Sequence, residues 1–133
     1  MERGQIVNRA RARQIIDFRV LKYERGITPT DIDGLIDFNN KFFVIIEIKY
    51  LDTPLPTGQR LAIERIVDNL INVSEGRYAI ALIASHDVGD TNKDIDCSKC
   101  IVTEVRIDGE WEKRIRIGAT VKNAIDFYKK KYE

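Results

Sequence analysis

The 133-residue chain has no apolar run near the ~20 residues that a membrane-spanning helix needs, so we expect no membrane association. Its arginine-rich first residues lack the apolar segment of a secretory signal, and we therefore expect a cytoplasmic protein. One histidine and two cysteines provide few of the four ligands that a structural zinc normally takes. We also find no internal repeat and no low-complexity linker.

The composition is that of an ordinary globular protein, with 44% apolar and 32% charged residues. This length predicts a single domain, residues 1–133, with a substantial core. The net charge of +1 hides basic ends, over residues 2–25 and from residue 113 onward, and an acidic stretch at 87–112. The uneven charge favours a surface that meets phosphates on one side; alternatively, these are solvated helix faces.

The spacing of apolar residues predicts an α/β fold. The expected elements are a helix at 5–15, a strand at 14–23, a hairpin at 31–38 and 42–50, a helix at 57–73, a buried strand at 77–85, a second hairpin at 101–107 and 110–117, and a helix at 119–131. A crossover through a helix normally makes the two strands that it joins parallel. We therefore expect a mixed sheet flanked by helices, with the strand at 77–85 parallel to the one at 42–50.

The first hairpin carries charged residues at spacings that put them on common faces. Side chains two apart on a strand point the same way, which groups Asp31 with Asp33 and Glu47 with Lys49. If the two strands pair in the right register, the carboxylates and the ammonium group meet on one surface. Carboxylates held close together favour a hard cation such as Mg²⁺.

The turn of this hairpin decides the register. Asp33 and Glu47 share a face only if the numbers of paired residues add up to an even sum. A two-residue turn gives an odd sum, whereas a three-residue loop at 38–40 gives an even one. Asp37 suits the first position of a type I turn, and Asn40 tolerates the left-handed conformation that follows. We therefore predict an odd-length loop or a bulge near Asn40.

Asp33, an apolar run, a turn, a second apolar run and the Glu47-x-Lys49 triplet together resemble the core motif of the PD-(D/E)XK nuclease superfamily. The longer string, residues 27–34, 47–50 and 55–64, resembles small phage and prophage proteins. The resemblance implies a restriction-endonuclease-like fold and hydrolysis of phosphodiester bonds in DNA. It also implies that Asp33 and Glu47, with a main-chain carbonyl near Ile48, hold Mg²⁺ or Mn²⁺ while Lys49 orients the attacking water.

Three further residues complete the expected site. By resemblance, Gln59 supports the metal-bound water or contacts the phosphate. Arg60 is a plausible phosphate ligand because a guanidinium grips phosphate oxygens with two hydrogen bonds. His86 follows the buried strand and is a candidate for substrate contact. Many members of the superfamily carry another glutamate on the first helix, but no acid near the start of this chain, whether Glu2, Asp17 or Glu24, fits that position clearly.

Each residue also has a structural interpretation. Asp33 would cap or bend the chain, Glu47 and Lys49 would form an ion pair, and Gln59 and Arg60 would serve the helix start. Cys97 and Cys100 are expected to be reduced thiols. Two alternatives to a nuclease therefore stay open: a catalytically weak or inactive nucleic-acid-binding module on the same fold, and a structural dimer. A homodimer is expected for a small domain that handles two DNA strands.

Overall fold

The computed structural model describes residues 8–113 and 119–133, and divides the chain into two compact units, Met1–Thr30 and Asp31–Glu133. The first unit contains the short helix α1 (Arg9–Ala12) and the 3-10 turn η1 (Glu24–Gly26), and no described residue up to 30 is buried. The helix predicted for 5–15 is thus only one turn long within the described part. The strand predicted for 14–23 is wrong: an alternating pattern makes a strand only where another strand pairs with it, and residues 8–30 contain no strand.

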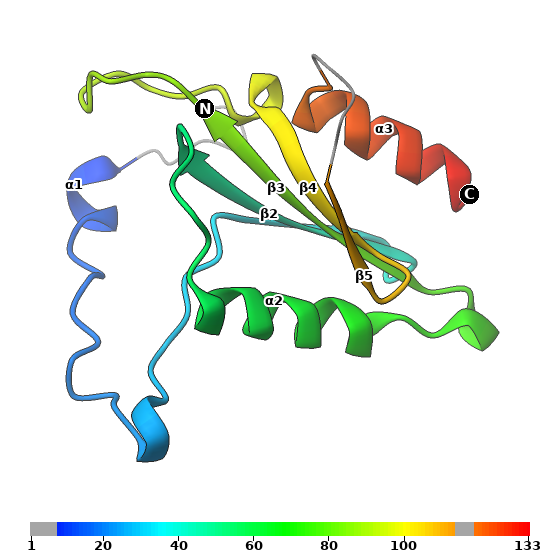
Figure 1. Cartoon of the computed structure of the whole chain (residues 1–133), viewed down its shortest axis with the longest axis horizontal. Coiled ribbons are helices and arrows are strands. Elements are labelled where there is room, and N and C mark those ends of the chain that lie inside the picture. Colours follow the sequence, from blue (N-terminus) through cyan, green and yellow to red (C-terminus); the bar gives the residue numbers. More distant parts are fainter. Residues whose placement is uncertain (1–7, 114–118) are drawn as a thin grey trace. The chain divides into compact units, whose positions relative to one another are not determined.

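The second unit is built on a five-stranded mixed sheet (Figure 1). Its strands, in spatial as well as chain order, are β1 (Gly34–Phe38), β2 (Phe42–Tyr50), β3 (Tyr78–His86), β4 (Ile101–Ile107) and β5 (Glu110–Lys113). β2 and β3 are parallel and joined through helix α2 (Thr57–Leu70), whereas the other neighbours are antiparallel. The predicted mixed α/β sheet, with its parallel pair, is confirmed.

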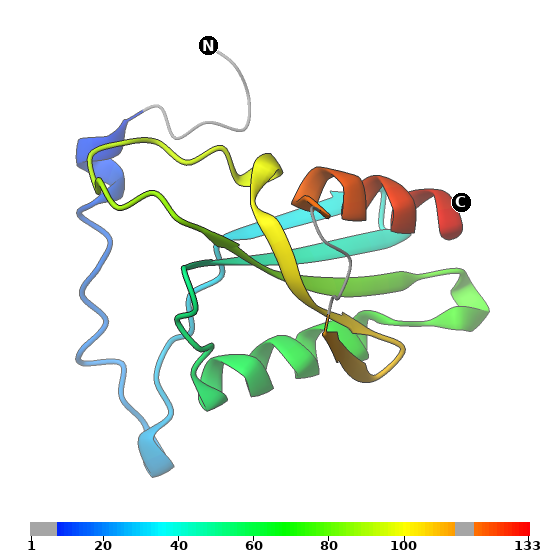
Figure 2. The same cartoon turned by 45° about the horizontal axis from the view of Figure 1, so that its top comes forward.

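Two helices cover opposite faces of this sheet, as Figures 1 and 2 show for α2 and α3 (Val121–Lys131). Alternation along β2 divides its side chains between them: Ile45 packs with the α2 core, and Val44 with the α3 core. The α2 core consists of Ile45, Leu55, Ile63, Val67, Ala79, Ala81 and Ile83. Odd-numbered residues of β2, including Glu47 and Lys49, therefore lie on the α2 side.

The first hairpin has the parity that the proposed site requires. Phe38 pairs with Phe42, so three residues, 39–41, connect the strands and paired numbers sum to an even value. The expected odd-length loop is confirmed. It lies one residue later than the predicted loop at 38–40, because Phe38 stays in β1 with its ring stacked on Phe42 at 5.7 Å between centroids.

Left-handed asparagines make this turn. Asn39 and Asn40 have φ of 55° and 61°, and the Lys41 N–H donates to the Phe38 carbonyl at 3.0 Å. Asparagine tolerates such conformations better than most residues. Asp37 accepts a hydrogen bond from the Asn40 N–H at 2.7 Å, so this aspartate serves the turn as expected, although both central residues are left-handed, unlike those of a type I turn.

The other elements lie close to their predicted bounds. α2 ends at Leu70 rather than at 73, and is followed by the 3-10 turn η2 (Val73–Glu75). The loop expected at 86–99 begins at residue 87, because β3 includes His86, and it ends in the 3-10 turn η3 (Cys97–Lys99). The predicted second hairpin is present around Asp108–Gly109, although residues 114–118 of its second arm lie outside the described part. No described helix is long and apolar enough to cross a membrane.

Candidate functional site

Asp33 and Glu47 meet at the end of the first hairpin. The last ladder pair is Gly34 with Ile46, and the same register places Asp33 opposite Glu47. The Asp33 carboxylate accepts a hydrogen bond from the Ile48 N–H at 2.7 Å, which fixes it against β2 just beyond the end of β1. Because the N–H and carbonyl of one strand residue point to the same side, the Ile48 carbonyl also points toward Asp33. The predicted pair of acids therefore lies together.

Glu47 is the unusual member of this group because it is a charged residue in the core. Its residue surface is only 3% exposed, and its Oε2 atom has no hydrogen-bond partner. Its other oxygen, Oε1, lies 3.2 Å from the Lys49 ammonium nitrogen. Buried carboxylates normally have their lone pairs occupied, so an unpartnered oxygen here indicates a missing ligand or a bound proton.

The surroundings of Glu47 raise its pKa above the ordinary value of 4.5. Burial is the main cause, because the charged form loses hydration, and the negative charge of Asp33 adds to it. The Lys49 ammonium and the polar side chain of Gln59 oppose the rise in pKa. The carboxylate is thus poorly compensated by the protein alone, and a cation beside it would favour its charged form.

The first turn of α2 holds Lys49 in place. Lys49 donates to the Gln59 side-chain oxygen at 3.3 Å, and the Gln59 amide nitrogen donates to the Asp31 carbonyl at 3.0 Å. Both ends of the glutamine side chain are therefore engaged, and Asp31 contributes through its main chain. A connected row of polar groups results, from Asp31 through Gln59 and Lys49 to Glu47.

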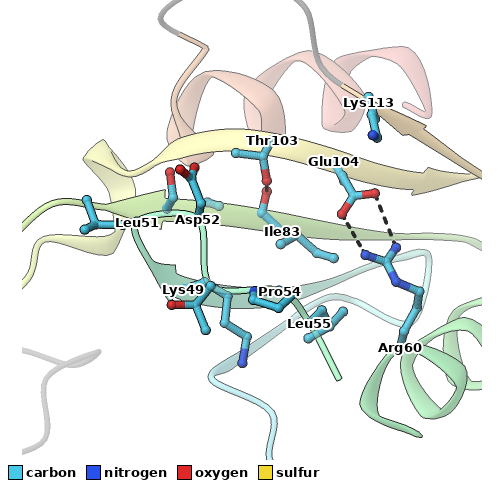
Figure 3. A pocket seen from close by; sticks show the side chains of 13 residues that line it. Lys49, Leu51, Asp52, Pro54, Leu55, Arg60, Ile83, Thr103, Glu104 and Lys113 are labelled. Carbon is cyan, nitrogen blue, oxygen red and sulfur yellow. Dashed lines mark hydrogen bonds and ion pairs between the residues drawn. The ribbon is translucent and has the colours of Figure 1, made fainter. Parts of the chain in front are cut away.

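The Arg60 guanidinium is held by other side chains of the protein (Figure 3). Its guanidinium forms two hydrogen bonds to the Glu104 carboxylate on β4, at 2.8 and 3.3 Å, and lies 4.6 Å from the Trp111 ring centroid. The Trp111 indole in turn donates to Glu64 on the next turn of α2 at 2.5 Å. Arg60 therefore anchors the start of α2 to the β4–β5 hairpin. Its predicted phosphate contact would compete with these bonds.

A double-mutant cycle separates the two roles of Arg60. We expect Arg60→Ala and Glu104→Ala each to cost about 1–2 kcal/mol of unfolding free energy, and the double variant to cost little more than either single one. Urea unfolding followed by tryptophan fluorescence measures this. A phosphate ligand would behave differently: Arg60→Ala would weaken salt-dependent DNA binding while Glu104→Ala would not.

His86 is the one predicted residue that lies away from the others. It pairs with Tyr50, one position beyond the Lys49–Ser85 pair, so alternation turns its side chain to the opposite face of the sheet from Lys49. Its Nδ1 accepts from the Val88 N–H at 3.1 Å, and its ring lies 5.4 Å from that of Tyr50. The structure thus places His86 at the same sheet edge but not beside Asp33 and Glu47.

Few groups of the site are available to bind a metal, and their donor atoms are hard oxygens. Among the described residues, no group of three or more His, Cys, Asp or Glu side chains is placed to hold an ion. Asp33, Glu47 and the Ile48 carbonyl offer oxygen atoms, which suit Mg²⁺ or Mn²⁺ with water in the remaining positions. Asp17 and Glu24 belong to the first unit, where Asp17 pairs with Arg19 at 2.9 Å, and Glu2 lies outside the described residues.

Sequence reasoning missed the contacts that come from distant parts of the chain. Glu104 and Trp111 were not predicted to hold α2, and no local pattern signals a pairing across more than forty positions.

Cys97 and Cys100 are free thiols, as expected. Burial, followed by the negative charges of Asp33 and Asp96, raises the pKa of the Cys97 thiol. Comparison of the chain with protein-family models, with curated proteins and with solved structures finds no match.

Proposed function

We propose that this protein is a metal-dependent nuclease that hydrolyses phosphodiester bonds in DNA. The buried, unpartnered Oε2 of Glu47, opposite Asp33 and next to the Lys49 amine, is the observation that carries the proposal. A buried carboxylate normally has partners for both of its oxygens, and the Lys49 amine bonds only Oε1. Asp33 and Glu47 would hold Mg²⁺ or Mn²⁺, which when bound lowers the pKa of water and polarises a phosphate.

The chain's own groups would do the rest. Lys49, steadied by Gln59, would orient the attacking water or stabilise charge on the phosphate oxygens. Asp33, fixed by the Ile48 N–H, would keep its second carboxylate oxygen free for the ion. The antiparallel β1–β2 pair, the parallel β2–β3 pair and α2 between them support a restriction-endonuclease-like fold. The protein would be of phage or prophage type. A homodimer would fit a small enzyme that cuts both strands of DNA.

The test is cleavage of supercoiled plasmid in Mg²⁺, Mn²⁺ or EDTA. We expect nicking only with a divalent cation, and loss of nicking in Asp33→Asn. Manganese at about tenfold over its dissociation constant should also stabilise the wild-type protein by about 1.4 kcal/mol, which raises the melting temperature by roughly 4 °C.

Asp108→Asn is the matched control for this test. Asp108 lies in the turn between β4 and β5 and has a left-handed backbone conformation, with φ of 51°. Asparagine adopts this conformation as readily as aspartate does, so the substitution should not disturb the turn. The control should keep both cleavage and the manganese shift. A wild-type protein that neither nicks DNA nor responds to manganese would contradict the proposal.

A second candidate is a nucleic-acid-binding module with weak or no catalysis. It is favoured by the lack of a third acidic ligand among the described groups near Asp33 and Glu47. Binding to DNA that weakens steeply with salt, without cleavage in either metal, would select this candidate, because phosphate contacts release counterions.

A further inference from the structure

A pocket of about 430 Å³ opens on the α2 side of the sheet, next to Lys49 (Figure 3). We call it the Thr103 pocket. It lies where β2 and β3 end, between the chain at 51–55, the start of α2 and β4. Ligands of sheets with parallel strands bind at the carboxyl ends of those strands, and the volume is within the range of small-molecule sites.

A β-bulge shapes one wall of this pocket. The pairing of β3 with β4 shifts by one residue between Ile83 and Ala84, which leaves Thr103 as an extra residue of β4. Thr103 and Glu104, although adjacent in sequence, consequently both line the pocket. The Thr103 hydroxyl donates to the Ile83 carbonyl at 3.1 Å, which supplies a partner where the ladder is interrupted. Bulges of this kind often re-aim side chains beside active sites.

The lining combines apolar surface with hydroxyl, cationic and acidic groups, the acids being Asp52 and Glu104. Leu55 and Ile83 are buried apolar residues of the wall, and Ser85 adds a hydroxyl group. Arg60 neutralises Glu104, whereas Lys113 forms no ion pair with any residue in the described part of the chain. A nucleotide matches this chemistry, because it joins a flat, partly apolar ring with polar edges to a phosphate group.

Lys49 connects the pocket to the acidic pair. Its side chain lines the pocket, while its amine, which bonds Glu47 and Gln59, points away from Thr103 and Glu104 in Figure 3. The Lys49 side chain therefore separates the acidic pair from the pocket, and a DNA strand whose phosphate met this amine would pass the side chain and place an adjacent nucleotide at the pocket. A base stacked and paired in a duplex cannot enter a recess of this size; it has to be unpaired first.

We propose that the Thr103 pocket seats one unpaired nucleotide next to the bond that is cut, so that the substrate is single-stranded or locally unpaired DNA. This inference rests on the proposed nuclease function. It names the substrate class that the same site would select.

Binding measured without metal tests the pocket apart from catalysis. Fluorescence anisotropy in EDTA would compare a short labelled DNA strand with the same strand in a perfect duplex. We expect the single strand to bind about tenfold more tightly than the duplex, because one base held in a pocket contributes roughly that gain in affinity. Thr103→Phe, which fills the pocket from an exposed strand position, should remove this preference.

Two further variants make the result decisive. Val73→Phe adds the same ring at an exposed position in η2 and should keep the preference. Thr103→Val removes the hydroxyl but little volume, so a loss as large as that in Thr103→Phe would overturn the proposal by assigning the effect to the bulge. Equal affinity for both DNA forms would also overturn it, even in a protein that nicks plasmid. If the wild-type protein preferred the single strand but did not nick plasmid, the result would count against the nuclease function alone.

Discussion

Glu47→Gln is expected to reduce metal-dependent DNA cleavage by at least about 10³-fold, because it removes one of the two carboxylates that would hold the ion. The substitution keeps the shape of the side chain and its place on β2, so the loss would reflect charge rather than folding. Single-turnover nicking of plasmid at saturating Mg²⁺ measures it. Cleavage within tenfold of the wild-type rate would contradict the assignment of Glu47 as a metal ligand.

The same variant should be more stable than the wild type in the absence of metal. Glu47 has a raised pKa in the folded protein, so folding favours its protonated form. Its cost to stability is therefore absent below the ordinary pKa of 4.5, grows as the pH rises through the raised pKa, and is complete above it. Glu47→Gln should lose this pH dependence and gain about 1 kcal/mol at neutral pH, which urea unfolding at several pH values would reveal.

Lys49→Met is expected to lower the cleavage rate by about 10²–10³-fold, the usual effect of removing one group that stabilises charge in a transition state. Unlike Glu47→Gln, it should keep the stabilisation by Mn²⁺, because both carboxylates remain. It should also raise the pKa of Glu47 further, since the Lys49 ammonium is one of the groups that lowers it. Nicking rates and melting temperatures with and without Mn²⁺ measure these effects.

Lys41→Met is the matched control for this substitution. Lys41 lies at the other end of β2, in the hairpin loop, where its amine donates to the Glu75 carbonyl. We expect near-wild-type cleavage from this variant. If Lys49→Met also abolished the manganese effect, the lysine would be holding the site together rather than acting on the substrate.

The first hairpin could be predicted from sequence because its determinants are local. Alternating side chains and two adjacent asparagines fix both the face and the parity of Asp33 and Glu47. The position of His86 relative to Lys49 could not be read in the same way. β3 is apolar on both faces, so its sequence does not show which side each residue takes.

Non-local contacts account for the remaining differences. The bonds of Arg60 to Glu104 could not be foreseen, because the two residues are far apart in sequence. The segment 14–23 has a strand-like pattern, but the described residues of its unit, 8–30, offer no neighbouring strand to pair with it. Local patterns therefore predicted the elements of the acidic pair, whereas the contacts of α2 and the pocket beside it depend on how β4 and β5 pack.

The three-residue loop at 39–41 limits how this protein can change over evolutionary time. Loss or gain of a single residue there would shift the pairing by one step and turn Asp33 toward the α3 side, away from Glu47. Only changes by two residues would keep both acids on the same side. Descendants of this sequence that retain the chemistry should therefore have hairpin loops of odd length, whereas lineages that have lost it are free to vary the loop by any number.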